Sequence, residues 1–363
     1  YQDSQSDLQS IKEDDWTPNN SYGFKDGLQP YRYQARAAEM ARKTGGLLLL
    51  DDVGLGKTVS ALAAISEPGQ LPAIIVVQPH LSEQWISEYI ERFTNLTSVA
   101  ITKTKPHKLP NVDVYVFKYS NIHGWLDYIS QLNYKSVVFD EIQELRHGIK
   151  TAKGAACRAV AQGANMVMGL TATPIYNHGN EIFAVLQNVK ENCLGSYIEF
   201  QIEWCPGGVS VSDPAALGSY LREENIALRR TEESEEVSLD LPALNKLLVE
   251  VDWNEDDAQT DKELQETLAR KILEGRFTER GQAARELDLM LRKQTGVAKA
   301  RSVAAYTRLI VESGEPAIIA AWHRDCYDIW NETLADLNPV MFTGTEGPKS
   351  KRRSKQAFMA GDS

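Results

Sequence analysis

The sequence predicts an α/β protein built on a parallel sheet. From about residue 22 to about residue 200, short apolar runs alternate with longer amphipathic stretches, a pattern typical of buried strands that alternate with helices. A glycine-rich loop follows the first apolar run, and two adjacent carboxylates follow a later one. Because α/β sheets expose their functional residues at the carboxyl ends of strands, the same pattern predicts a site there.

Five apolar runs are the strand candidates of this sheet. They are Leu47–Leu50, Ile74–Val77, Val112–Phe117, Val137–Phe139 and Met166–Leu170. Amphipathic stretches at residues 81–93 and 154–161 lie between these runs and predict helices.

The composition limits the class of protein. Thirty-nine lysines and arginines stand against 50 aspartates and glutamates, which gives a net charge of −11. This balance disfavours a nucleic-acid-binding protein, but it averages over the surface and leaves a local basic groove open. Apolar runs are far shorter than the roughly 20 residues that cross a bilayer. We therefore expect a cytoplasmic protein with no membrane partner.

The four cysteines are Cys157, Cys193, Cys205 and Cys326, and no two of them form a C-x-x-C pair. This wide spacing argues against a disulfide framework and against a zinc site. We expect buried free thiols.

The chain is long enough, at 363 residues, for two domains with cores of their own. We expect a polar lead-in at 1–21, a first lobe at 22–235, an acidic linker with a helical insert at 236–299, and the beginning of a second lobe at 300–363. Residues 232–240 carry the acidic run EESEEVSLD, which is typical of solvated surface.

The last third of the chain predicts helices followed by a second α/β unit. Leucines and isoleucines recur at helical spacing, so we expect helices over residues 258–293. Residues 317–322 and 339–344 are apolar and predict strands, with a helix at 325–337 between them. Two strands cannot bury both faces of a sheet, so this unit is incomplete or leans on the first lobe.

The loop DDVGLGKT at residues 51–58 carries the first candidate chemistry. The phosphate-loop pattern requires Gly, four residues and then Gly-Lys-Ser/Thr; Gly56, Lys57 and Thr58 fit, while Asp51 occupies the first glycine position. A predicted strand precedes the loop and a predicted helix follows it, so backbone N–H groups from Gly54 onward can wrap a phosphate. Lys57 would reach the β- and γ-phosphates, and Thr58 would coordinate Mg²⁺. The alternative is a glycine-rich turn with a surface lysine.

The segment SVVFDEIQ carries the second candidate chemistry, because it places Asp140 and Glu141 after an apolar run. An aspartate there can hold Mg²⁺, and the adjacent glutamate can orient or deprotonate an attacking water. The alternative is a helix N-cap with an acidic first turn. The loop and the acid pair occur in order on separate predicted strands, which favours a nucleotide site over both plain alternatives.

A series of blocks resembles the superfamily-two helicase-type ATPases, and specifically their Swi/Snf-like branch of double-stranded DNA translocases. An acidic pair also stands in that family's phosphate loop, so Asp51 supports the resemblance. The residues Asp-Glu-Ile-Gln at 140–143 and Tyr-Asn-His at 176–178 resemble those of bacterial or phage members. The blocks are LQPYRYQ (28–34), DDVGLGKT (51–58), VVQPHLSEQW (76–85), VFKYSNI (116–122), VVFDEIQELRH (137–147), GLTATPIYN (169–177), LRRTEESEEVSLDLP (228–242), PAIIAAWHRDCYDIW (316–330) and VMFTGTEG (340–347).

The resemblance implies a RecA-like parallel sheet lobe with helices on both faces, then a helical insert and the start of a second RecA-like lobe. It implies ATP and Mg²⁺ as cofactors. By position, Gln34 would contact adenine, Asp140 and Thr58 would hold Mg²⁺, and Glu141 would activate water. The implied phosphate-binding residues are Gly54, Leu55, Gly56, Lys57 and Thr58.

The resemblance also implies contacts with the backbone of double-stranded DNA, which position a duplex without reading its sequence. Three residues would couple the nucleotide site to DNA: Gln143, Thr171 and Thr173. The alternative for each of them is a plain polar residue in a turn or a helix cap. Five residues would lie near loops that touch DNA: Gln78, Pro79, His80, Lys118 and Ser120. His80 equally fits a helix entry.

Further residues of the later blocks carry two readings each. Trp322 and His323 follow a predicted strand, as motif IV residues do, but we expect Trp322 to be a core tryptophan. The basic run at 349–355 would face DNA phosphates or begin a solvated helix. Arg229 and Arg230 would brace the lobes or form surface salt bridges with the carboxylates beyond them.

Family members carry motifs V and VI, with an arginine that completes the ATP site, and in this sequence nothing after Ser363 supplies them. Loss of an arginine finger slows related phosphoryl transfers by about 10³ to 10⁵. We therefore expect the 363-residue piece to bind ATP and to hydrolyse it slowly.

The leading interpretation is an ATP-dependent translocase on double-stranded DNA that remodels or displaces bound proteins. Two alternatives stay open: an ATP-dependent switch or scaffold for a protein partner, and a strand-separating DNA or RNA helicase. Duplex-stimulated, salt-sensitive ATP hydrolysis separates the motor from the switch.

Overall fold

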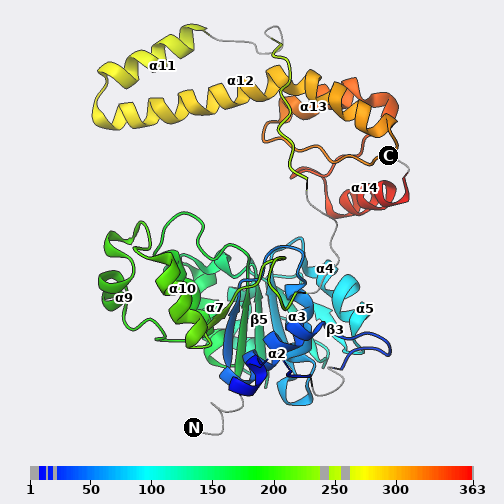
Figure 1. The fold of residues 1–363 in the computed structure, drawn as a ribbon, viewed down its shortest axis with the longest axis vertical. Coiled ribbons are helices and arrows are strands. Elements are labelled where there is room, and N and C mark those ends of the chain that lie inside the picture. The colour runs from blue at the N-terminus through cyan, green and yellow to red at the C-terminus, as the bar shows by residue number, and fades with distance from the viewer. Residues whose placement is uncertain (1–7, 14, 19–22, 238–244, 255–261, 362–363) are drawn as a thin grey trace. The chain divides into compact units, whose positions relative to one another are not determined.

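A computed structural model describes residues 8–13, 15–18, 23–237, 245–254 and 262–361 (Figure 1). The chain divides into two compact units, Tyr1–Leu241 and Pro242–Ser363. The first unit carries the predicted sheet, and the second is helical in its described part. No helix in the described ranges is long and apolar enough to cross a membrane.

The described part of the first unit holds a seven-stranded sheet in which every ladder is parallel. The spatial order is β3-β4-β2-β5-β6-β1-β7. The predicted α/β fold is therefore confirmed. The strands are β1 (Gly46–Leu49), β2 (Ala73–Val77), β3 (Ser98–Ala100), β4 (Val114–Lys118), β5 (Ser136–Asp140), β6 (Met166–Leu170) and β7 (Ala227–Leu228).

Both faces of the sheet are buried, because successive side chains of a strand point to opposite faces. Leu48 packs in one apolar cluster, whereas Leu47 and Leu49 pack in the other. Ile74 and Ile75 of β2 divide in the same way. Burial on both faces explains why these strands read as continuous apolar runs.

Helices cover the two faces in sequence order (Figure 1). The face of Leu47 is covered by α2 (Arg32–Thr44), α3 (Lys57–Ile65) and the continuous helix α4 (Ser82–Gln84), η2 (Trp85–Ile90) and α5 (Glu91–Phe93), in which η2 is a π-helix. The face of Leu48 is covered by α6 (Leu126–Ile129), α7 (Ala152–Gln162), α8 (Glu181–Val189), α9 (Tyr197–Glu203) and α10 (Pro214–Glu223). Short 3₁₀ turns are η1 (Pro68–Gln70), η3 (Ile122–Trp125), η4 (Ile142–Leu145), η5 (Gly148–Lys150) and η6 (Pro206–Gly208).

The second unit packs its helices around a small apolar core. Trp330 of α13 (Arg324–Thr333) is buried and donates its indole N–H to the carbonyl of Ala300 on α12 (Phe277–Glu312), at 2.9 Å. The prediction of helices within 258–293 is confirmed from residue 262 onward, while 258–261 fall outside the described residues. The described elements of the second unit are α11 (Lys262–Glu274), α12 (Phe277–Glu312), α13 (Arg324–Thr333), η7 (Ala335–Leu337) and α14 (Pro348–Ala360).

The strands predicted at 317–322 and 339–344 are not strands in the structure. A strand needs a ladder partner, and residues 317–322 make none; instead Ala321 bonds the hydroxyl of Tyr327 through its N–H and its carbonyl. The expected core role of Trp322 is also wrong, because its side chain is 90% exposed. Without a sheet, the segment has no second layer to bury the indole.

The domain boundaries stay predictions. α12 runs without a break through residue 300, where we expected an insert to give way to a second lobe. The acidic run behaves as surface where it is described: Glu232, Glu233 and Glu235 are exposed, and residues 238–240 fall outside the described part.

Candidate functional site

Apart from Gln34, which lies in α2, the predicted site residues of the first unit lie at or beyond the carboxyl ends of five neighbouring strands. Because all ladders are parallel, these ends lie along one edge of the sheet. Register fixes the alignment: Leu170 pairs with Leu49 on one side and with Asp140 on the other. The structure therefore brings together the loops that begin after β1, β2, β4, β5 and β6, and with them Lys57, Thr58, Gln78, Lys118, Ser120, Asp140, Glu141, Thr171 and Thr173.

The loop after β1 has the backbone of a phosphate cradle. Gly54 has φ +93° and Gly56 has φ +73°, a region that side chains rarely adopt. Gly56 caps α3, so the following N–H groups point out of the helix start. A Cβ at Gly56 would lie 2.5 Å from Nε2 of Gln34. Glycine is therefore required both by φ and by the close approach of Gln34.

Gln34 is joined to this loop. Its Nε2 donates to the carbonyl of Leu55 at 3.1 Å, and its Oε1 accepts from the backbone N–H of Tyr31 at 2.9 Å. The hydroxyl of Tyr33 donates to the same Leu55 carbonyl at 2.7 Å. The glutamine segment and the loop therefore form one hydrogen-bonded unit, and Gln34 is 4% exposed.

The ammonium group of Lys57 is held by the first two residues of its own loop. Its Nζ donates to the backbone carbonyls of Asp51 at 2.7 Å and Asp52 at 3.2 Å. Burial lowers the pKa of Lys57, and the charges of Asp51, Glu141 and Asp140 oppose that shift. The ammonium group is thus within electrostatic reach of both candidate carboxylates.

Asp51, the residue that departs from the strict pattern, is completely buried and paired with Arg230. Arg230 Nε donates to Oδ1 at 2.9 Å, Arg230 Nη2 donates to Oδ2, and the Arg230 backbone N–H donates to Oδ1 at 3.1 Å. Burial raises the pKa of Asp51, and the hydrogen bonds from Arg230 oppose the rise. Arg230 Nη1 also bonds the carbonyl of Tyr33, and the guanidinium lies 4.8 Å from that ring's centre. The alternative of a surface salt bridge is therefore wrong for Arg230.

The segment at residues 229–237 lies along the glutamine segment and the loop. Arg229 forms a weak exposed bridge of 3.4 Å to Asp52, rather than to the carboxylates beyond it. Glu236 pairs with Arg36 of α2 at 2.7 Å, and Val237 packs in one buried cluster with Tyr33 and Leu55. The pairing of residues 51–52 with residues 229–230 was not predicted, although an acidic doublet and a basic doublet stand at these positions in the sequence.

Asp140 ends β5 and is held by two aromatic residues. The indole N–H of Trp85 donates to its Oδ2 at 2.7 Å, and the hydroxyl of Tyr119 donates to its backbone carbonyl at 3.0 Å. Burial raises the pKa of Asp140 to about 6; the Trp85 hydrogen bond lowers it and the Glu141 charge adds to the rise. Burial disfavours the charged form of Asp140, so a cation bound beside the carboxylate would offset that cost.

The raised pKa of Asp140 predicts a pH-dependent stability in metal-free, nucleotide-free protein. The folded-state pKa, about 6, exceeds the ordinary 3.8, so folding is opposed increasingly as pH rises from about 4 to 6, by roughly 3 kcal/mol in total. Asp140→Asn lacks this charge. In thermal unfolding with EDTA, its melting temperature relative to wild type should therefore increase from pH 5 to pH 7.5. A difference that is constant with pH would contradict the shift.

Glu141 has φ +53°, unusual for a residue with a side chain. Gln143 Nε2 donates to its Oε2 at 2.5 Å, while Oε1 of Gln143 is buried with no partner among the described residues. Backbone conformations of this kind concentrate at functional sites. Gln143 thus orients the side chain of Glu141, and its own Oε1 is left without a hydrogen-bond donor among the described residues.

The residues expected near DNA differ in their surroundings. Pro79, His80 and Ser120 are exposed, and Lys118 is half-buried at the end of β4. Gln78 reaches Glu144 at 3.5 Å. Thr171 is buried and its hydroxyl accepts from the backbone N–H of Thr173 at 2.9 Å, so the two threonines form a tight turn.

The donor set suits Mg²⁺ bound together with a nucleotide. Among the described residues no group of three or more His, Cys, Asp and Glu side chains forms a metal cage. Mg²⁺ is commonly bound through one or two oxygen ligands plus phosphates and water, and the Asp140 carboxylate and Thr58 hydroxyl are ligands of that type. The cysteines take no part: all four are free, three are buried and Cys193 is half-buried.

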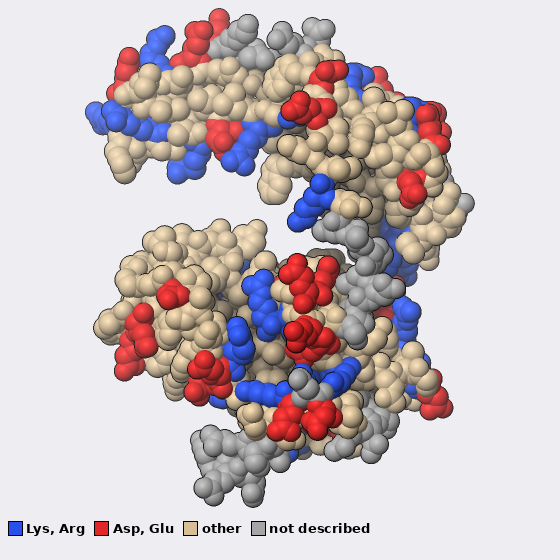
Figure 2. All heavy atoms as spheres, in the orientation of Figure 1, with Lys and Arg blue, Asp and Glu red and all other residues tan. Residues whose placement is uncertain are grey.

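Charge on the surface is mixed rather than segregated. Figure 2 shows lysines and arginines interspersed with carboxylates over one face of the first unit. In the second unit α12 carries basic side chains that pair with neighbours, such as Arg308 with Asp336 at 2.6 Å. The basic run at 349–355 lies in the helix α14. The expected basic groove stays a prediction.

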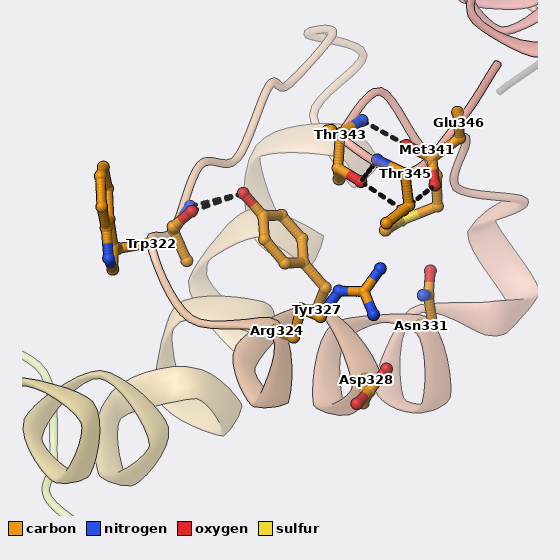
Figure 3. Close-up of a pocket in the computed structure, with 11 residues that line it drawn as sticks. Trp322, Arg324, Tyr327, Asp328, Asn331, Met341, Thr343, Thr345 and Glu346 are labelled. Atoms are coloured by element: carbon orange, nitrogen blue, oxygen red, sulfur yellow. Dashed lines mark hydrogen bonds between the residues drawn. The ribbon is translucent and has the colours of Figure 1, made fainter. Parts of the chain in front are cut away.

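The second unit has a cavity of about 620 Å³ (Figure 3). Arg324, Tyr327 and Asn331 rise from α13, and the turn with Thr343 and Thr345 faces them. The cavity contains none of the phosphate-loop residues. The candidate nucleotide site therefore lies elsewhere, at the loop and the acid pair of the first unit.

A family model and two curated proteins are similar to this chain. A model of the SNF2-related domain matches residues 33–299. A SWI/SNF-related matrix-associated actin-dependent regulator of chromatin subfamily A-like protein 1 of Xenopus laevis is 27% identical over 310 residues, 82% of this chain and 31% of that protein. The putative ATP-dependent helicase/translocase YwqA of Bacillus subtilis is 27% identical over 61% of this chain and 25% of that protein. The chain thus spans about a third or less of these two relatives.

A solved structure shares the fold. The Sulfolobus solfataricus SWI2/SNF2 ATPase core in complex with dsDNA superposes with a TM-score of 0.54 at 19% identity, covering 94% of this chain and 78% of that chain. Relatives come from animals and from a bacterium, so a bacterial or phage origin stays a prediction.

Proposed function

The chain belongs to the SNF2-related domain family of Swi/Snf ATPases, and from that premise we propose that it couples ATP hydrolysis to movement along double-stranded DNA. The supporting observation is the single carboxyl edge of the sheet. It carries the phosphate cradle, the acid pair and the exposed loops after β2 and β4 together. Movement along DNA would remodel or displace bound proteins.

In the proposed reaction, bound ATP with Mg²⁺ supplies the γ-phosphoryl group and a cation that neutralises its charge. Lys57 would exchange the carbonyls of Asp51 and Asp52 for phosphate oxygens, and Thr58 and Asp140 would hold the cation. Glu141, oriented by Gln143, takes a proton from the attacking water. Gln34 keeps the loop in register and borders the adenine.

The proposed DNA contacts lie at Gln78, His80, Lys118 and Ser120, with Gln143, Thr171 and Thr173 between them and the nucleotide. Backbone contacts of this kind bind duplexes of any sequence and weaken as salt rises. We also propose the division into a first RecA-like lobe at 22–235, a linker and insert at 236–299, and the beginning of a second lobe at 300–363. Alternating grip by two lobes would move the protein without separating strands.

Lys57→Ala tests this proposal in the full-length protein that contains these residues. We expect wild-type ATP hydrolysis to rise several-fold with linear duplex DNA and to lose that stimulation at high salt. Lys57→Ala should lose the hydrolysis, because the ammonium contact to the phosphates is gone. The readout is phosphate release with and without duplex.

The alternatives predict other outcomes of the same assay. A switch or scaffold for a protein partner would hydrolyse or bind ATP at a rate indifferent to DNA and salt. A strand-separating helicase would release a labelled strand from a forked duplex. Hydrolysis that Lys57→Ala leaves intact would contradict the nucleotide site itself.

A further inference from the structure

Trp85 connects two parts of the site that lie on different strands. Its indole is 1% exposed and donates its N–H to Oδ2 of Asp140 at 2.7 Å. This bond restrains rotation of the carboxylate, so a shift of Trp85 would change the orientation of Asp140. An indole has one donor and no acceptor, so its bond to Asp140 cannot be reversed.

The other end of this connection is the exposed loop after β2. The N–H of Leu81 donates to the carbonyl of Gln78 at 3.0 Å, and the N–H of Trp85 donates to the carbonyl of Leu81 at 2.9 Å. Three hydrogen bonds therefore lead from Gln78 to the Asp140 carboxylate. Pro79 and His80, within this loop, are exposed to solvent.

The helix that carries Trp85 has an unusual winding. A π-helical stretch begins at Trp85 and ends at Ile90, and the N–H of Glu91 donates to the carbonyl of Ile86, five residues earlier. Such stretches are rare and often occur at functional sites. Because a π turn and an α turn differ by one residue, a change between them shifts the residues on one side by one position. A coupling element requires two discrete arrangements, and a change between a π turn and an α turn would supply them.

We propose that Trp85 is a positioning residue through which a duplex bound at residues 78–80 sets the orientation of the Asp140 carboxylate. The inference rests on the proposed function, because it assumes that the loop touches DNA. It assigns to one indole N–H a physical link between DNA binding and the rate of ATP hydrolysis. Trp85 contacts neither DNA nor nucleotide in this role.

Trp85→Phe tests the link, because it keeps an aromatic ring and removes the donor. We expect kcat in saturating duplex to fall about tenfold, as for loss of a hydrogen bond to a charged group, with the KM for ATP and the half-saturating duplex concentration little changed. If Trp85 had only a structural role, Trp85→Phe would lower the rate of ATP hydrolysis by the same factor without duplex and with saturating duplex.

Trp125→Phe is the matched control. Trp125 is also fully buried in the first unit, but it packs on the other face of the sheet and donates its indole N–H to the backbone carbonyl of Lys103, at 2.9 Å. This control should keep its duplex stimulation. Thermal unfolding of both variants shows whether each is folded.

A second measurement needs no folded Trp85 variant. In ¹⁵N-labelled wild type, the seven indole N–H resonances are assigned by replacing tryptophans in turn, that of Trp85 by elimination if necessary. Addition of duplex should shift the Trp85 resonance. A stationary resonance at saturating duplex, or full stimulation in Trp85→Phe, would overturn the inference and leave the motor standing. A wild type that ignores duplex would overturn the proposed function and the inference with it.

Discussion

Replacing Glu141 with glutamine is expected to lower the rate of ATP hydrolysis by a factor of about 10² to 10⁴, the usual contribution of a general base. Glu141 follows β5 at the edge that carries the phosphate cradle, and Gln143 orients its carboxylate. Glutamine has the same shape but cannot take a proton from water. ATP affinity should therefore change little, which binding of a fluorescent nucleotide analogue measures beside phosphate release.

Glu144→Gln is the control for this substitution. Glu144 lies three residues further along, and its carboxylate pairs with Lys153 at 2.6 Å. Loss of that bridge should leave hydrolysis within a small factor of wild type. Equal rates for Glu141→Gln and wild type would remove Glu141 from the proposed chemistry.

Replacing Arg230 with methionine is expected to destabilise the first unit by about 3 to 5 kcal/mol, because it leaves the Asp51 charge buried without its partner. For a unit of this size the melting temperature should fall by roughly 10 °C. The double variant Asp51→Asn with Arg230→Met removes both charges and should recover part of this loss. Denaturant unfolding followed by circular dichroism measures all three proteins.

Arg229→Met is the matched control, since it removes the neighbouring arginine from an exposed bridge. Its side chain is 58% exposed and lies 3.4 Å from Asp52. Exposed pairs contribute under about 1 kcal/mol, so this variant should unfold close to wild type. Equal effects at 229 and 230 would show that the burial of the Asp51 pair has no energetic weight.

The strands predicted from the sequence are those of four or five residues whose side chains are mostly apolar and buried on both faces of the sheet. Met166–Leu170 was predicted to the residue, and the other four candidates overlap β1, β2, β4 and β5. β3 and β7 were missed because they have three and two residues, too few for periodicity. The reverse error occurred at Ile318, which is apolar but 83% exposed. An apolar run in the sequence shows which residues favour burial. It does not show whether another strand is available to pair with them.

The candidate site divides in the same way. Loops with local signatures, such as the glycines before Lys57 and the acid pair at 140–141, were predicted because backbone geometry and strand ends dictate their residue types. The pairs Asp51 with Arg230 and Trp85 with Asp140 were not. Their members lie 179 and 55 residues apart, and only the folded sheet brings them together.

The position of β1 within the sheet has a consequence for synthesis on the ribosome. β1 lies between β6 and β7, so both of its ladder partners are translated more than 100 residues after it. Arg230 follows Asp51 by 179 residues, a delay of roughly 10 to 40 s at 5 to 20 residues per second. Within this unit, the loop of the candidate nucleotide site is thus among the first parts to leave the ribosome and among the last to be completed. A nascent chain would acquire its affinity for ATP only when nearly the whole first unit has emerged.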